Sequence, residues 1–385
     1  MSDTPRPWWQ SWTVLAPPIA LAVLLVTFGR HIPVWLAVLL AAVLAVAVLA
    51  AVHHAEVVAH RVGEPFGSLV LAIAVTVIEV ALIVTLMISG ESGASTLARD
   101  TVFAAVMITT NGIVGISLLT GAQRFGVAVF NPEGTGAALA TVATLSALSL
   151  VLPTFTSTPG PEFSPAQLSF AALASIALYV MFVFTQTGQH RGNFLPVPTS
   201  GTGATGVPTT ETVAPAESGS TPPRQEEGHS SPPSARAALL SLGLLLVALV
   251  DVVGLAKVES HSIESAVKAA GAPPSFVGVV IALLVLAPET LAAVRSARRE
   301  QVQISLNLGY GSAMASIGLT IPSIAVATIW LKGPLELGLG STQLVLLALT
   351  VAVSILTVVP GRATRLQGGI HLVLLAAFVF LAIKP

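Results

Sequence analysis

The stretch 68-SLVLAIAVTVIEVALIVTLMIS-89 is an apolar run long enough to cross a lipid bilayer, and it carries one acidic residue, Glu79, near its centre. A second run of the same kind, 275-SFVGVVIALLVLAPETLAAV-294, carries Glu289. A charged side chain at the bilayer centre costs roughly 2.5–3.5 kcal/mol, so two such residues at similar depth indicate a function. Because carboxylates bind hard cations and protons, the pair predicts cation transport coupled to protons.

The composition of the chain is that of a membrane protein. Its 385 residues are 54% hydrophobic and only 9% charged, whereas a soluble domain carries about 25% charged residues. The net charge of −1 argues against nucleic acid as a partner, and the absence of cysteine excludes disulfides, thiolate metal sites and cysteine nucleophiles. We therefore predict an all-α polytopic membrane protein whose partners are the lipid bilayer and the transported ions. The oligomeric state stays open.

About eleven apolar segments are candidate transmembrane helices, since each approaches the length of about 20 residues that a span needs. The first segment has no small-residue cleavage site, so we interpret it as a span rather than a signal peptide. The candidates are 12–29, 33–54, 68–89, 101–122, 137–156, 164–187, 236–257, 274–295, 305–331, 341–360 and 366–384.

The segment 188–235 separates the spans into two sets. It is rich in Gly, Ser, Thr and Pro, a composition that predicts a disordered linker. We expect an extra N-terminal transmembrane helix in 1–32, a first five-helix repeat in 33–187 and a second in 236–385. Because five is odd, the two repeats must have inverted topology, which in transporters places the site at the midplane on the repeat interface.

The basic residues predict the orientation in the membrane. If the N-terminus is cytoplasmic, eleven of the 17 Lys and Arg residues lie in cytoplasmic segments and six lie outside. Cytoplasmic loops carry an excess of positive charge. We therefore predict a cytoplasmic N-terminus, a cytoplasmic linker and an outward C-terminus.

Polar residues near the two acids complete a candidate cation site. Thr76 is three residues before Glu79 and therefore shares a helix face with it. The spans that follow the acids carry Asn111 in the first repeat, and Ser312 and Ser316 in the second. The two serines are four residues apart and lie on one face.

The residue before the second acid adds another source of ligands. Pro288 directly precedes Glu289, removes a backbone donor and frees a carbonyl group upstream. Carboxylate, hydroxyl, amide and carbonyl oxygens are the ligands that Ca²⁺ or Na⁺ accepts. We therefore expect a site for a transported cation and no resident cofactor.

Three segments around these residues resemble the ChaA family of bacterial calcium/proton antiporters, within the calcium/cation antiporter superfamily. They are 63-GEPFGSLVLAIAVTVIEVALIV-84, 98-ARDTVFAAVMITTNGIVG-115 and 288-PETLAAVRSARREQVQISLNLGYGSAMASIGLTIP-322. The resemblance implies a multi-pass protein of the bacterial inner (cytoplasmic) membrane that exchanges cytoplasmic Ca²⁺, and also Na⁺ or K⁺, for external protons.

The resemblance also assigns roles to individual residues. It places the two repeat acids at Glu79 and Glu289, and their polar partners at Asn111, Ser312 and Ser316. In place of the Gly-Asn pair that often precedes each acid in the superfamily, this chain has Val75-Thr76 and Leu286-Ala287.

Other functions remain as alternatives. One is a Na⁺/H⁺ or K⁺/H⁺ exchanger with little Ca²⁺ transport, and a more distant one is a cation channel without proton coupling. We do not expect an enzyme, because the chain has neither a His-Glu-x-x-His motif nor a Gly-x-Ser-x-Gly elbow. Asp251 is the one deep aspartate and is either a proton-relay residue or a vestibule residue. His371 is expected to be a hydrogen-bonded interior histidine.

Overall fold

The computed structural model describes residues 12–30, 32–63, 66–89, 93–188, 190–197, 233–330 and 333–385. Most of the predicted linker, 198–232, lies outside the described residues. The helices are α1 (Trp12–Thr27), α2 (Val34–Val62), α3 (Phe66–Ile88), α4 (Leu97–Met107), α5 (Val114–Phe125), α6 (Pro132–Ser146), α7 (Pro165–Thr187), α8 (Ala235–Ala269), α9 (Phe276–Ala297), α10 (Val302–Ala327), α11 (Ser341–Val358) and α12 (Arg365–Ile383).

The prediction of an all-α polytopic membrane protein is confirmed. In the described part of the chain, ten helical segments are long and apolar enough to cross a membrane, and α1 is a shorter apolar helix of 16 residues. α4 and α5 form one continuous span, because the π-helix η2 (Ile108–Ile113) joins them. A second π-helix, η3 (Ala147–Val151), extends α6 toward the 3-10 turn η4 (Leu152–Phe155).

The connecting segments meet at two opposite ends of the molecule. At one end, the short strands β1 (Ala128–Val129) and β2 (Arg362–Ala363) pair antiparallel and join the two halves of the chain. At the other end, the Ser95 hydroxyl donates to Glu336 at 3.0 Å. Since consecutive spans alternate in direction between these ends, α3 and α9 run in opposite directions, as inverted repeats require.

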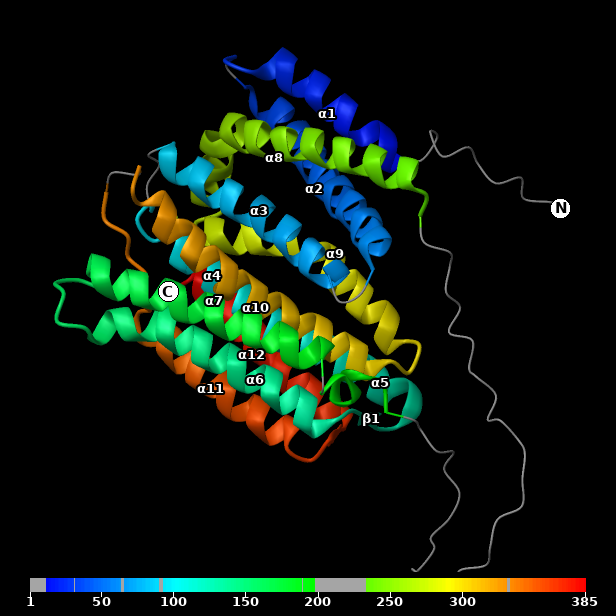
Figure 1. Ribbon diagram of the computed structural model, residues 1–385. Coiled ribbons are helices and arrows are strands. Elements are labelled where there is room, and N and C mark those ends of the chain that lie inside the picture. Colours follow the sequence, from blue (N-terminus) through cyan, green and yellow to red (C-terminus); the bar gives the residue numbers. More distant parts are fainter. Residues whose placement is uncertain are drawn as a thin grey trace, which may run out of the picture.

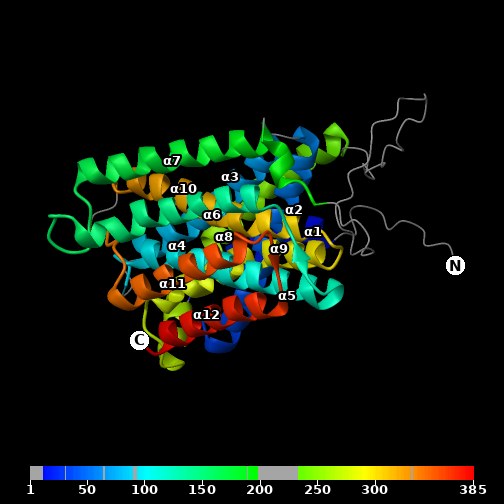
Figure 2. The ribbon, with the colours of Figure 1, turned by 90° about the horizontal axis from the view of Figure 1, so that it is seen from below.

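Two hydrophobic cores divide the helices into layers. α1, α2 and α8 form a peripheral bundle whose core includes Leu44, Val48 and Val252. A larger core fills the space among α4 to α7 and α10 to α12. Figure 1 shows the bundle above α3 and α9, away from α6, α11 and α12, and in the view from below α11 and α12 lie in front of it (Figure 2).

The helices that carry the two acids lie between these cores. On α3, Ile78 packs into the core of the bundle, whereas Ile83 packs into the larger core. On α9, Val285 packs into the core of the bundle and Leu286 packs into the larger core. Both acids are themselves buried, so Glu79 and Glu289 lie inside protein rather than among acyl chains.

Candidate cation site

A cavity of about 390 Å³ lies between α3, α7, α9 and α10. It runs from the middle of α3 and α10 toward the end of the molecule at which α3 begins and α7 ends. Five of the six residues that the sequence predicted for the cation site line it, namely Thr76, Glu79, Glu289, Ser312 and Ser316. The cavity therefore joins polar groups from both repeats.

Glu79 makes a direct contact across the repeat interface. Its carboxylate is 4% exposed, and Oε1 accepts a hydrogen bond of 2.6 Å from the Ser316 hydroxyl of α10. Thr76, one turn earlier on α3, is 5% exposed and lines the same cavity. Because a hydroxyl oxygen also carries lone pairs, Ser316 can turn from donating to Glu79 to coordinating a cation beside it.

Glu289 is buried without a full set of partners. Its side chain is 8% exposed, and Oε2 has no hydrogen-bond donor in the described structure. The carboxylate also interacts electrostatically with Glu79 and with Glu56 of α2. Two buried acids that repel each other have a strong requirement for positive charge, which either protons or a metal cation can satisfy.

The donor set limits how a cation can be held. Within the described residues, no three Asp, Glu or His side chains form a group that could hold a metal ion by themselves. A cation in this cavity would therefore take two carboxylates and draw its other oxygens from hydroxyl groups, backbone carbonyls and water. Pro288 lies inside α9 and has no N–H group to donate to the carbonyl of Leu284, so the carbonyl five residues before Glu289 lacks its helical hydrogen bond.

The structure does not bring Asn111 to this cavity. Its Nδ2 group donates to Thr350 Oγ1 of α11 at 2.9 Å, and its Oδ1 lies 3.1 Å from Nδ1 of His371 on α12. His371 is fully buried and its Nε2 lies 3.2 Å from Thr357 Oγ1, which confirms that it is a hydrogen-bonded interior histidine. Asn111 lies on the π-helix η2 and links the first repeat to the second.

Three polar residues of the cavity were not predicted from the sequence. Tyr179 and Gln186 reach it from the C-terminal half of α7, and Asn307 reaches it from the start of α10. Asn307 is already engaged, because its Nδ2 donates to the Phe194 carbonyl at 2.6 Å. Amides near the ends of spans are common at membrane interfaces, so nothing in the sequence marked these residues as part of a site.

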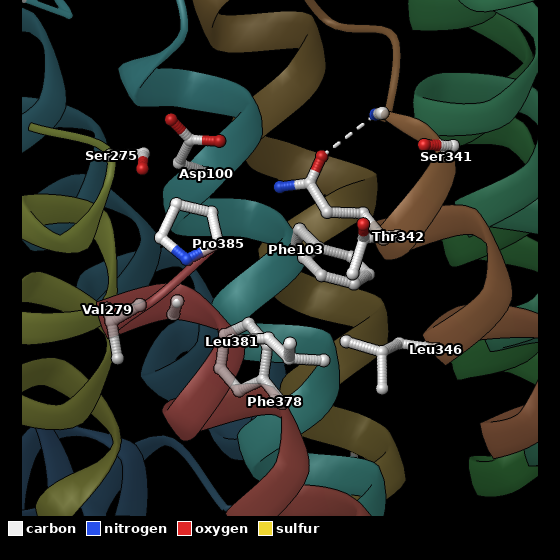
Figure 3. A pocket seen from close by; sticks show the side chains of 13 residues that line it. Asp100, Phe103, Ser275, Val279, Ser341, Thr342, Leu346, Phe378, Leu381 and Pro385 are labelled. Carbon is white, nitrogen blue, oxygen red and sulfur yellow. Dashed lines mark hydrogen bonds between the residues drawn. The ribbon is translucent and has the colours of Figure 1, made fainter. Parts of the chain in front are cut away.

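A second cavity of about 240 Å³ lies at the other end of the molecule, where α4, α9 and α11 begin and α12 ends (Figure 3). Its one acid, Asp100, accepts hydrogen bonds from Thr96 Oγ1 at 2.7 Å and from Arg99 Nε at 2.9 Å. The rings of Phe103 and Phe378 meet edge to face below it, with centroids 5.6 Å apart. Because Asp100 is paired with an arginine, this cavity lacks the uncompensated negative charge of the first.

The chain belongs to the family described as sodium/calcium exchanger protein, which it matches over residues 13–188 and 240–384. The family is one of membrane transporters, as the arrangement of inverted repeats and buried acids indicates. Both matched segments include one of the two glutamates and exclude most of the predicted linker.

Individual relatives cover almost the whole chain. The protein y4hA of Sinorhizobium fredii is 40% identical over 97% of this chain and 96% of its own length. The sodium-potassium/proton antiporter ChaA of Escherichia coli is 33% identical over 95% of each chain. The solved structure of native YfkE superposes with a TM-score of 0.67 at 15% identity, covering 97% of this chain and 99% of that one, so it shares the fold.

Proposed function

We propose that the chain is a secondary antiporter that exchanges a cytoplasmic cation, Ca²⁺ in the first instance, for protons. The observation that carries the proposal is the convergence of Glu79 and Glu289 on one cavity between the repeats. When both are deprotonated, they bind the cation together with Thr76, Ser312 and Ser316. When both are protonated, the cation has no charge to hold it.

Competition for the same two carboxylates explains obligatory exchange. A cation and a pair of protons neutralise the same charges, so the cavity holds one or the other but not both. Alternating access requires that the cavity open to each side in turn, by movement of one group of helices against another. The separate cores on the two sides of α3 and α9 are suited to this, because each can move as a packed unit.

The distribution of basic residues supports a cytoplasmic location for the end at which the cavity lies. Among the described residues, nine Lys and Arg side chains belong to that end and five to the other. By the positive-inside rule the first end is cytoplasmic, and the chain then has a cytoplasmic N-terminus in a bacterial inner membrane. The nine are Arg61, Arg124, Arg191, Arg236, Arg295, Arg298, Arg299, Arg362 and Arg365. The five are Arg30, Arg99, Lys257, Lys268 and Lys384.

A second candidate cargo is Na⁺ or K⁺. It is favoured by the 33% identity to a relative whose name gives sodium, potassium and protons as its ions. It is also compatible with a site that offers two carboxylates, because a monovalent cation needs less negative charge than Ca²⁺.

Reconstitution of the purified protein tests the function and the cargo together. Proteoliposomes that contain a pH dye would receive Ca²⁺, Na⁺ or K⁺ outside, with choline chloride as the control. We expect Ca²⁺ to drive the release of protons to the outside, against the response to choline. Proton movement with Na⁺ or K⁺ alone would assign the second cargo, and cation flux without proton movement would reject an antiporter.

A further inference from the structure

α8 carries a buried acid that the cation cavity does not use. Asp251 lies at the middle of the apolar part of this helix, and its side chain is completely buried. Neither carboxylate oxygen has a hydrogen-bond partner in the described structure. An isolated charge in such surroundings is very unfavourable, so the carboxyl group holds a proton in this conformation.

The neighbouring helices supply no partner for this proton. His54 of α2 lies 3.3 Å from Ser241 near the start of α8. Because α2 and α8 are antiparallel, the residues of α2 level with Asp251 lie about ten positions before His54, around Leu44. Leu44 and its neighbours Leu40 and Val48 are buried and apolar.

The charged and titratable groups on these helices lie elsewhere. On α2 they belong to the last three turns: His53, His54, Glu56, His60 and Arg61. The helix α1 has none. On α3 and α9 the acids are Glu79 and Glu289, which line the cation cavity, and Arg295 lies in the last turn of α9.

Two further buried acids follow Asp251 along α8 toward the outer end. Glu259 is two turns beyond Asp251, is 2% exposed, and has no partner for Oε1. Glu264 follows at 6% exposure and pairs with Lys268 at 2.5 Å. The helix geometry puts Asp251 and Glu259 about 12 Å apart along the axis.

The contact between α2 and α8 forms a seam, and its inner end is also polar. His54 Nε2 lies 2.9 Å from the Thr13 carbonyl oxygen of α1, so this nitrogen donates a proton. His54 Nδ1 then accepts from the Ser241 hydroxyl. Polar groups therefore lie at both ends of the seam, and Asp251 is the protonatable group between them.

We propose that Asp251 is a third proton-carrying residue of the transport cycle, loaded from the outer side by way of the buried Glu259. The inference rests on the proposed function, because it adds a proton to the exchange. Two protons on Glu79 and Glu289 balance one Ca²⁺, so a third on Asp251 moves one net positive charge with the protons in each cycle. Exchange is then electrogenic.

Charge movement in proteoliposomes tests this directly. Proteoliposomes adsorbed to a solid-supported membrane would receive a Ca²⁺ jump, and pH and Ca²⁺ dyes would report the proton-to-cation ratio. We expect the wild type to produce a sustained current. Asp251→Asn should continue to exchange Ca²⁺ for protons, with one proton fewer per cation and no current. The surface variant Glu133→Gln should match the wild type in both measurements.

Several results would overturn the inference. Electroneutral exchange by the wild type would do so without any variant, and so would an unchanged charge per cation in Asp251→Asn. If Asp251→Asn does not fold, Asp251→Glu should fold and retain the wild-type ratio, and a lower ratio in that variant would contradict the inference. The absence of any proton-coupled cation flux in the wild type would instead reject the proposed function.

The variant Glu259→Gln distinguishes the delivery of protons to Asp251 from the carrying of protons by Asp251. If Glu259 passes protons to Asp251, this variant should exchange more slowly at high external pH while the proton-to-cation ratio stays that of the wild type. A loss of one proton per cation in Glu259→Gln would assign the carrying role to Glu259 and contradict it for Asp251.

Discussion

Ser316 of the second repeat donates a hydrogen bond of 2.6 Å to Glu79 of the first. The contact joins residues that are 237 positions apart in the chain, and it forms at the wall of the cavity that also holds Glu289. It couples the acid of one half of the molecule to the helix of the other. Any change in how the halves meet therefore changes the environment of Glu79.

Removal of this hydroxyl should weaken cation binding while exchange continues. The hydroxyl stabilises the charged form of Glu79, and without it protons compete more strongly with the cation. Hydrogen bonds to charged groups contribute about 1.5–3 kcal/mol, and about 1.4 kcal/mol corresponds to a factor of ten. Ser316→Ala should therefore raise the apparent KM for the cation at least about tenfold. Ser323→Ala is the matched control, because its hydroxyl only bonds the Leu319 carbonyl on the same helix. Equal KM values for the two variants would show that Ser316 contributes no binding energy.

Asn111 should act on stability rather than on cation affinity. Its loss in Asn111→Ala leaves Thr350 and His371 without their shared partner in a buried network. Unsatisfied buried groups cost about 1–3 kcal/mol each, so the variant should unfold at a lower temperature in detergent. A raised KM with an unchanged unfolding temperature would instead make Asn111 a ligand.

Because α4 packs closely against α9, we expect Gly278, at the outer end of α9, to tolerate no larger residue. A Cβ atom at Gly278 would lie 2.7 Å from the Thr101 backbone nitrogen. Backbone atoms cannot move aside cheaply, so Gly278→Ala should destabilise the fold by about 1–3 kcal/mol. Gly243→Ala of α8 has open space around it and should not lower the unfolding temperature, because alanine favours the helix more than glycine does. Equal unfolding temperatures for both variants would mean that α4 and α9 pack less closely than described.

Much of the fold could be predicted from the sequence because spans of this length need nothing but continuous apolar residues. Both glutamates could be identified as functional for the same reason, since a charge is conspicuous in an apolar run. Their neighbours Thr76 and Ser316 follow from helical periodicity along α3 and α10, where the backbone is regular.

The position of Asn111 could not be predicted because it depends on an irregular backbone. The π-helix at Ile108–Ile113 adds a residue to one turn and rotates the side chains beyond it, and nothing in ITTNGI signals this. Its partners Thr350 and His371 come from spans more than 200 residues away. Gln186 and Asn307 join the cavity only because α7 packs against α10, a contact that the order of helices does not specify.

The central claim is that Glu79 and Glu289 share one cation and exchange it for protons. The most direct test measures the Ca²⁺ flux and the proton flux in the same proteoliposomes. It compares the wild type with Glu79→Gln and Glu289→Gln, and Glu133→Gln is the surface control. We predict that each cavity variant inserts and folds normally but loses both fluxes together, whereas the control keeps them. Near-normal exchange by either cavity variant, or cation flux that persists without protons, would contradict the account.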